Sequence, residues 1–202
     1  MIVSIHQPSY WAWLGLLNKI AQSDIYVALN NVQANKSSYQ YRTLLYCNGE
    51  SKFLTLPVNY HFGIKINELK YSKENWHEDH VSKIFNYYRN APFFDKLFPE
   101  LKDFYLTSLN LSVEDLIIST MIFLFKKFKI SVKIIKSSEL NLNKNKGDLV
   151  LEICKKLNAD IYISGQGSKD YMTPEILSKF NDADITVSWQ EFKYPVYNQF
   201  NK

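Results

Sequence analysis

The first thirty residues place the tightest limit on what this chain can fold into. An apolar run at 2–6 has a strand pattern, an apolar-periodic segment from about Trp11 to Gln22 is typical of a helix, and residues 24–30 return to a strand pattern. A strand, a helix and a strand within this length form a βαβ unit, whose crossover is right-handed and whose strands run parallel. The sequence therefore predicts an α/β protein with a parallel sheet.

The middle of the chain has a different pattern. Strand-like segments at 41–47 and 52–58 flank Asn48-Gly49, which is a strong hairpin signal because both residues tolerate positive φ. Helices are then expected over 75–90 and 93–107. Ser112 can cap the next helix, with Asp115 at the capping-box position.

The last third returns to alternation. Strands are expected at 130–136, 160–164 and 185–188, and helices at 147–157 and 173–180, the latter with Thr173 as its cap and Pro174 at its first position. We find no internal repeat, low-complexity tract or linker. We therefore expect residues 1–202 to form one α/β domain, with an open, mainly parallel Rossmann-like (nucleotidyltransferase-like) sheet, an inserted antiparallel β-hairpin and a central helical segment.

Composition narrows the class of protein. Hydrophobic residues make up 46% of the chain and charged residues 22%, which suits one compact core. Cys47 and Cys154 lack metal-ligand spacing, and the start of the chain lacks a signal-peptide pattern, so a reducing cytoplasm is expected. The most apolar stretch, 116–125, is about half the roughly 20 residues of a membrane span, and it predicts a buried helix.

Charge indicates the kind of partner. The formal net charge is +4, and the basic residues are scattered among acids except for short runs such as Lys126-Lys127. This balance suits an anionic small molecule such as a nucleotide better than a nucleic acid. Aromatic residues make up 15% and can stack on sugars or bases, although most are expected in the core.

A ligand site is expected where the predicted strands end. In open parallel sheets, ligands bind beyond the carboxyl ends of the strands, near the point where the strand order reverses. The first strand ends at His6-Gln7, the second at 30–33, and a late strand at 164–167. We predict that these ends and the polar stretch after the second strand line one cleft, through His6, Gln7, Asn31, Gln33, Lys36, Arg42, Ser164 and Gly165.

Each candidate has a functional and a structural interpretation. His6 can act as a general acid or base, or donate to a phosphate, or it can satisfy buried backbone groups. Residues 164–167 can bring backbone N–H groups close to a phosphate, or they can form an ordinary turn. Lys36 and Arg42 can hold a phosphate or carboxylate through charge-assisted bonds, or lie in a solvated loop. His77 and His80 have Glu78 and Asp79 between them but no clear third ligand, so we predict no metal site.

Residues 5–24 resemble the opening of the WbqC-like family. They include Ile5-His6-Gln7-Pro8-Ser9-Tyr10, Trp13 and Leu14-Gly15, and the similarity continues nearly to the C-terminus, through Val32-Gln33, Lys36, Arg42, 54–58, 91–94, 137–140, 162–165 and Tyr197 with Gln199. The resemblance implies a cytoplasmic protein of bacterial surface-glycan (O-antigen or lipopolysaccharide) biosynthesis. The family has been suggested to include glycine transferases acting on amino sugars.

No catalytic residues are established for that family, so the roles assigned here are our own. They are His6 and Gln7 as catalytic residues; Tyr10, Trp13, Asn31, Gln33, Lys36 and Arg42 as substrate-binding residues; and Ser164, Gly165 and Gly167 as phosphate-binding residues.

The chain departs from the family pattern in three places. Asn30-Asn31 stands where a pair of aspartates is usual, Ala12 stands where proline is usual, and the chain stops at Lys202, where another helix is expected. If the aspartates bind a divalent cation, restoring them should raise activity or metal binding. If they form caps or turns instead, asparagine substitutes well.

Three classes of function compete. The leading hypothesis is a transferase or ATP-dependent enzyme that joins a small acyl group, such as glycine, to the amino group of a nucleotide-linked sugar. ATP and Mg²⁺ suit this architecture, by analogy with nucleotidyltransferase-like ligases. The alternative is a non-catalytic module that binds a sugar nucleotide. An RNA-modifying relative would need a basic face that we do not find. In the first two cases a nucleotide should bind with an affinity that falls as salt rises.

Overall fold

The computed structural model describes residues 1–47 and 49–197, which fall into two units. The first unit contains residues 1–8, 12–32 and 122–194. Among the described residues, the second contains 9–11, 33–47, 49–121 and 195–197. The expectation of one domain over residues 1–202 stays a prediction.

The first unit is built on a five-stranded sheet in which every neighbouring pair is parallel. The order of the strands is β5-β2-β1-β6-β7. Their bounds are β1 (Ile2–His6), β2 (Ile25–Ala28), β5 (Lys133–Lys136), β6 (Ile161–Ser164) and β7 (Thr186–Trp189). The predicted Rossmann-like parallel sheet is therefore confirmed, and each predicted strand is present within a few residues of its expected ends.

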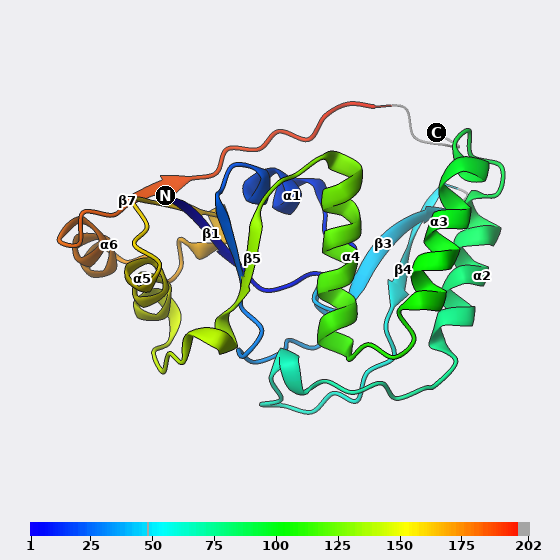
Figure 1. Cartoon of the computed structure of the whole chain (residues 1–202), viewed down its shortest axis with the longest axis horizontal. Coiled ribbons are helices and arrows are strands. Elements are labelled where there is room, and N and C mark those ends of the chain that lie inside the picture. The colour runs from blue at the N-terminus through cyan, green and yellow to red at the C-terminus, as the bar shows by residue number, and fades with distance from the viewer. Residues whose placement is uncertain (48, 198–202) are drawn as a thin grey trace. The chain divides into compact units, whose positions relative to one another are not determined.

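Helices cover both faces of this sheet (Figure 1). The four helices that contribute to the unit are α1 (Leu14–Ala21), the part of α4 (Val113–Phe128) from Ile122 onward, α5 (Lys146–Lys156) and α6 (Pro174–Asn181). The helix α6 begins as predicted, because the Thr173 side chain accepts a hydrogen bond from the Ile176 N–H and Pro174 follows it.

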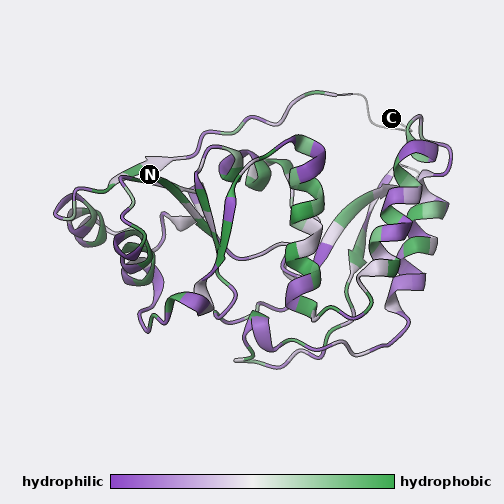
Figure 2. Ribbon diagram, viewed as in Figure 1, coloured by the Kyte–Doolittle hydropathy of each residue, from purple (hydrophilic) through white to green (hydrophobic). Residues whose placement is uncertain are grey.

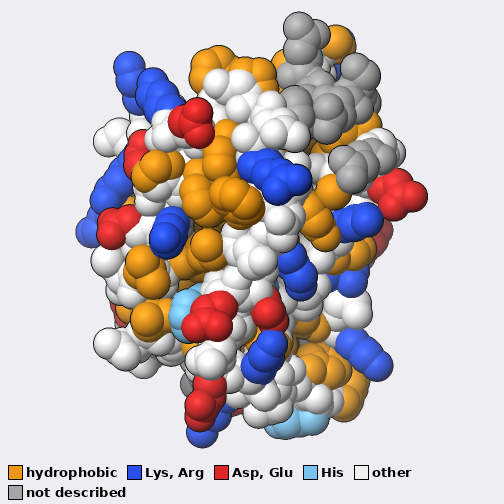
Figure 3. Space-filling model, turned by 90° about the vertical axis from the view of Figure 1, so that its right-hand side faces the viewer, with side chains coloured by type: hydrophobic (Ala, Val, Ile, Leu, Met, Phe, Trp, Pro, Cys, Tyr) orange, Lys and Arg blue, Asp and Glu red, His pale blue; other side chains and the backbone are white. Residues whose placement is uncertain are grey.

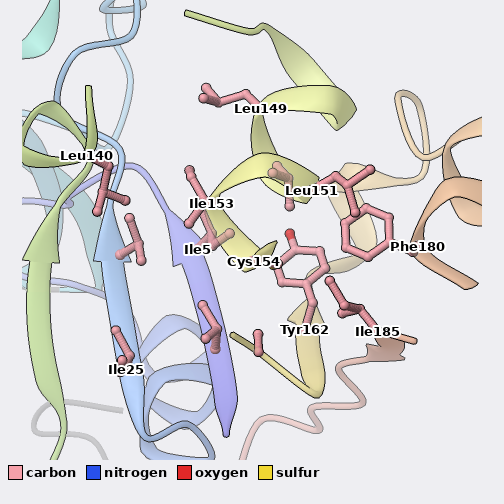
Figure 4. Close-up of a cluster of buried hydrophobic side chains, with 14 of the residues drawn as sticks. Ile5, Ile25, Leu140, Leu149, Leu151, Ile153, Cys154, Tyr162, Phe180 and Ile185 are labelled. Atoms are coloured by element: carbon pink, nitrogen blue, oxygen red, sulfur yellow. The ribbon is translucent and has the colours of Figure 1, made fainter. Parts of the chain in front are cut away.

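The main core of the first unit lies on the α5 and α6 side of the sheet. Ile5 and Ile25 from the strands pack in one cluster with Ile153 of α5, Tyr162 of β6 and Phe180 of α6 (Figure 4). Burying each large apolar side chain stabilises the fold by about 1.5–3 kcal/mol. Helices α5 and α6 thus cover the apolar side chains of β1 and β2 on this face, as is usual for a parallel sheet.

The second unit contains the predicted antiparallel hairpin and the central helices. Its strands β3 (Arg42–Cys47) and β4 (Glu50–Thr55) pair in register, with Arg42 opposite Thr55. Asn48 lies outside the described residues, but Gly49 has a φ of 84°, as a tight hairpin turn requires. The turn η1 (Ile66–Glu68) and the helices α2 (Trp76–Tyr88), α3 (Phe94–Thr107) and α4 as far as Met121 follow.

The exposed face of α2 and α3 is mixed in character (Figure 3). Phe85, Phe93 and Leu97 are exposed on it, beside lysines and acidic side chains. At the start of α4, Ser112 Oγ accepts a hydrogen bond from the Asp115 N–H at 3.1 Å, which confirms the predicted cap.

The first helix begins later than its apolar periodicity predicts. It starts at Leu14, whereas the helix was expected from about Trp11, which has a φ of 49°. The reason is tertiary: Tyr10 and Trp11 belong to the second unit and pack there, so their apolar character does not signal a helix. Periodicity alone cannot separate these two uses of an aromatic side chain.

A directed chain of hydrogen bonds holds Tyr10 and Trp11 in the second unit. His80 Nε2 lies 3.0 Å from the Thr55 carbonyl oxygen, so this nitrogen carries the ring proton and Nδ1 is an acceptor. Tyr10 therefore donates its hydroxyl proton to His80 Nδ1, at 2.8 Å. The Tyr10 oxygen accepts from the Tyr105 hydroxyl at 2.6 Å, and the Tyr105 oxygen accepts from Trp11 Nε1 at 2.9 Å. Each of these polar side-chain atoms of His80, Tyr10, Tyr105 and Trp11 has a hydrogen-bond partner, which favours a structural role for Tyr10.

We expect Tyr10→Phe to lower the free energy of unfolding by about 1–3 kcal/mol, because it leaves the buried His80 Nδ1 without a donor and the Tyr105 hydroxyl without an acceptor. Urea unfolding measures the loss. The control is Tyr194→Phe, which removes a hydroxyl from a largely exposed ring. Equal, small effects of the two substitutions would show that the hydrogen-bond chain adds nothing to stability.

Candidate functional site

The strand order of the first unit reverses between β1 and β6. From β1 the chain adds β2 and then β5 on one side, and it then crosses back to place β6 and β7 on the other side of β1. Ligands of such sheets bind at the carboxyl ends of the strands at this reversal. Here those ends are His6 and Ser164, the last residues of two adjacent parallel strands.

His6 is a neutral imidazole whose Nε2 has no hydrogen-bond partner among the described residues. Its Nδ1 lies 2.7 Å from the Gln7 carbonyl oxygen, which can only accept, so Nδ1 carries the proton and Nε2 carries the lone pair. The ring meets Trp13 edge to face, with 5.4 Å between centroids. Burial, and then the positive charge of Lys19, lower the pKa of His6 to about 4. His6 can therefore serve as a proton acceptor at neutral pH, whereas an imidazolium donor to phosphate is disfavoured.

Lys19 is a polar residue of this region that the sequence analysis missed. It lies on the buried face of α1, and its Nζ donates to the carbonyl oxygen of Ile5, the residue before His6, at 2.8 Å. Burial lowers the pKa of Lys19 to about 8. The available signal was a lysine on the apolar face of α1, beside Leu16 and Ile20, where a solvated charge is not expected.

At the end of β2, asparagine and serine side chains form a closed cluster with the turn η2 (Ser137–Leu140). The Asn30 Oδ1 accepts from the Ser138 N–H at 2.9 Å and from Ser137 Oγ at 3.0 Å, and Asn30 Nδ2 donates to Ser138 Oγ at 2.8 Å. Ser137 Oγ also lies 2.5 Å from Asn31 Oδ1. These contacts tie the carboxyl ends of β2 and β5 together and favour the structural interpretation of the asparagine pair.

After β6, Gly165 and the turn η3 (Gln166–Ser168) present an open backbone surface. A Cβ atom added at Gly165 or Gly167 would meet nothing within 4 Å. Neither glycine has positive φ, so neither is required by backbone conformation. Ser164 Oγ hydrogen-bonds Ser168 Oγ, which accounts for the buried serine as a structural group. That Gly165 and Gly167 bind a phosphate stays a prediction.

The remaining predicted residues lie in the second unit. The Arg42 guanidinium sits over the Phe53 ring, 3.8 Å from its centroid, and its buried Nε has no hydrogen-bond partner among the described residues. Lys36 is exposed, and Gln33 forms an isolated antiparallel bridge with Lys65. His6, Gln7, Trp13, Asn31, Ser164, Gly165 and Gly167 lie in the first unit. That the two sets of residues line one cleft stays a prediction.

Two shallow cavities lie elsewhere in the first unit. One, of about 420 Å³, is lined by residues 184–187 at the start of β7 together with residues of α6. The other, of about 620 Å³, lies between the end of α4 and the start of β5. Both are at the amino edge of the sheet. The candidate site therefore rests on the strand reversal and its polar side chains, not on either of these two cavities.

Within residues 1–47 and 49–197, no three His, Cys, Asp or Glu side chains gather closely enough to hold a metal ion. The His80 ring is already bonded at both nitrogens, to Tyr10 and Thr55. Burial is the main cause that lowers the pKa of His80 to about 4.

The strand order defines a doubly wound α/β protein, a class in which ligands bind at the carboxyl edge of the parallel sheet. The chain belongs to the WbqC-like protein family, whose model matches residues 7–202. It is also 23% identical, over 202 residues, to the uncharacterized protein Rv1507c of Mycobacterium tuberculosis (strain ATCC 25618 / H37Rv), an alignment that covers 99% of this chain and 85% of the relative. No solved structure matches.

The resemblance seen in the sequence is thus confirmed at the level of the family. In the part of the chain that the structure describes, no helix has the length and apolar character needed to cross a membrane.

We expect the free energy of unfolding to rise with pH between about 4 and 6.5. His6 and His80 have folded pKa values of about 4 against an ordinary value of 6.5, so in this window the unfolded chain binds more protons than the folded one. The stability is lost as pH falls, by at most about 3 kcal/mol for each histidine. Urea unfolding at several pH values, compared between wild type and His6→Asn, isolates the His6 share. An imidazole NMR titration that places the His6 pKa near 6.5 would contradict this.

For the asparagine pair, we expect Asn30→Asp with Asn31→Asp to gain no stabilisation from Mg²⁺ or Mn²⁺, because Asn30 Oδ1 is already occupied by the Ser137 hydroxyl and the Ser138 N–H. By contrast, Asn30→Leu should cost about 1–3 kcal/mol, since it leaves the Ser138 N–H without its acceptor. Thermal unfolding with and without the cations measures both. Metal-dependent stabilisation of the aspartate variant alone would restore the metal-binding interpretation.

Proposed function

We propose that this chain is an enzyme of bacterial surface-glycan (O-antigen or lipopolysaccharide) biosynthesis, which transfers a small acyl or aminoacyl group such as glycine to an amino sugar on a nucleotide carrier. The assignment to this pathway rests on the resemblance to WbqC-like proteins. The observation that carries the chemistry is His6, whose protonated Nδ1 is fixed by the Gln7 carbonyl and whose Nε2 is free at the strand reversal.

The proposed step forms an amide bond. The neutral amino nitrogen of the sugar attacks the carbonyl carbon of an activated acyl group, and the bond from that carbon to its leaving group breaks, with the electron pair departing on the leaving group. Attack makes the nitrogen cationic and strongly acidic, so a weak base is sufficient to take its proton. His6 Nε2 accepts that proton, which assigns general-base catalysis to a histidine that is uncharged before the reaction.

Substrate activation and binding complete the proposal. ATP is the activating co-substrate: the carboxylate of the acyl donor displaces pyrophosphate, and AMP is the leaving group in the amide-forming step. Mg²⁺ would enter with the phosphates of ATP. The open backbone at Gly165 and Gly167 is the surface proposed to accept the phosphates of the nucleotide.

We expect nucleotide-linked amino sugars incubated with ATP and glycine to gain one glycyl group, measured by mass spectrometry. His6→Asn should lower turnover by about 100-fold or more, the usual contribution of a general base, with little change in substrate affinity. The matched control is His61→Asn, which changes an exposed histidine of the second unit. Unchanged turnover in folded His6→Asn would remove His6 from the mechanism.

A second candidate function is a non-catalytic module that binds a sugar nucleotide in the same pathway. The observation that favours it is the asparagine pair, which places amides where carboxylates are usual and engages Asn30 in a closed cluster. Calorimetry separates the two functions: binding of the nucleotide sugar without formation of product, in every donor and acceptor combination tested, supports the module.

A further inference from the structure

A basic and apolar segment remains unexplained by the proposed site. Residues 116–138 contain no Asp or Glu, whereas lysines stand at 126, 127, 129, 133 and 136. The segment covers most of α4, the connection after it, and β5. Figure 2 shows hydrophilic residues at both ends of α4 and a mostly hydrophobic body between them; the last turn carries Lys126 and Lys127. Such a local excess of positive charge favours binding of a negatively charged partner.

The structure gathers this segment into one surface, the α4–β5 patch, formed by residues 122–134. The patch contains the cavity of about 620 Å³. The apolar residues that line this cavity include Ile122, Phe125, Ile130, Val132 and Ile134. Lys126 and Lys129 also line the cavity. Ile122, which lines the cavity, has 37% of its surface exposed, and Phe128, the last residue of α4, has 54%. An apolar floor with a cationic rim is the combination that recognises an anionic amphiphile.

The charges of the patch are available for such a partner. Lys126, Lys129 and Lys133 are exposed, and within the described residues none of them forms a salt bridge. The acidic residue at the margin of the patch is Asp24, whose carboxylate accepts a hydrogen bond from the Ile2 N–H and whose carbonyl oxygen accepts from the Lys133 N–H. The patch is therefore cationic overall.

A purely structural role explains only part of this pattern. The strand β5 is an edge strand, and lysines on an edge strand prevent pairing with another sheet, which accounts for Lys133. It does not account for Lys126 and Lys129, which lie on and just after a helix, or for the exposed Phe128 between them. The same lysines oppose docking of a second copy of this chain through β5.

We propose that the α4–β5 patch docks the protein on a membrane surface that carries anionic phospholipids. Lys126, Lys129 and Lys133 contact the negatively charged headgroups, and Phe128 and Ile122 enter the boundary between headgroups and acyl chains. Such binding is peripheral and needs no membrane-spanning helix. It is independent of the proposed reaction, because the patch lies at the amino edge of the sheet and His6 at the carboxyl edge.

The test is sedimentation of the full chain with phosphatidylcholine vesicles, with and without phosphatidylglycerol, at low and physiological salt. We expect binding only to the anionic vesicles, and a weaker affinity as salt rises. Each lysine changed to Gln at 126, 129 and 133 should weaken binding about fivefold, the factor that corresponds to about 1 kcal/mol per basic residue, and the triple variant by about 100-fold. Phe128→Ser should weaken binding without changing its salt dependence.

The matched control is the triple variant of Lys83, Lys96 and Lys102 to Gln, which removes the same charge from exposed positions on α2 and α3. It should retain the affinity of the wild type. Equal losses in the two triple variants, equal binding to uncharged vesicles, or no binding to anionic vesicles would each overturn the proposal. So would an affinity for single-stranded polynucleotide as high as that for the vesicles, because it would indicate a general polyanion surface.

Discussion

Parallel pairing of β1 on both of its edges is the constraint on which the first unit depends. Val3 and Ser4 pair with β2 on one side and β6 on the other, so β1 is the centre of the sheet and its side chains are buried on both faces. Before its end, the strand has one polar side chain inside it, Ser4, which is buried and hydrogen-bonded to Ser23 Oγ. The first polar side chain that is free to meet a ligand is therefore His6, at the point where the strand order reverses.

The environment at this point limits the chemistry of His6. Burial and the neighbouring Lys19 charge disfavour the imidazolium, while the Gln7 carbonyl fixes the proton on Nδ1. Both effects leave a neutral base with one free nitrogen. The asparagine cluster at the end of β2 has no such available atom on Asn30, because serine partners occupy both the oxygen and the nitrogen of its side-chain amide. The carboxyl edge thus combines a reactive group with a rigid hydrogen-bonded support.

Much of the fold could be predicted from the sequence because local signals and tertiary structure agree there. The strand periodicity, the Ser112 and Thr173 caps and the Gly49 turn all appear where expected. The start of α1 could not be predicted, because the aromatic side chains of Tyr10 and Trp11 continue the helical periodicity but pack in the second unit. The roles of Lys19 and Ser137 could not be predicted either. Lys19 bonds the Ile5 carbonyl of another element, and Ser137 bonds Asn30, which is distant in the chain. For the site, strand ends identified His6 and Gly165, but no local pattern reveals that Arg42 stacks on Phe53.

The central claim is that ligands of this protein bind at the carboxyl edge of the sheet, at the reversal between β1 and β6. A ¹H–¹⁵N NMR titration of the full chain with a nucleotide-linked amino sugar tests it most directly. The account predicts that the largest shifts fall on the backbone amides of Gln7, Asn31, Gly165 and Gly167. Shifts concentrated instead at the amino edge, on Thr186 or Ser131 beside the two cavities, with the carboxyl edge unchanged, would contradict it.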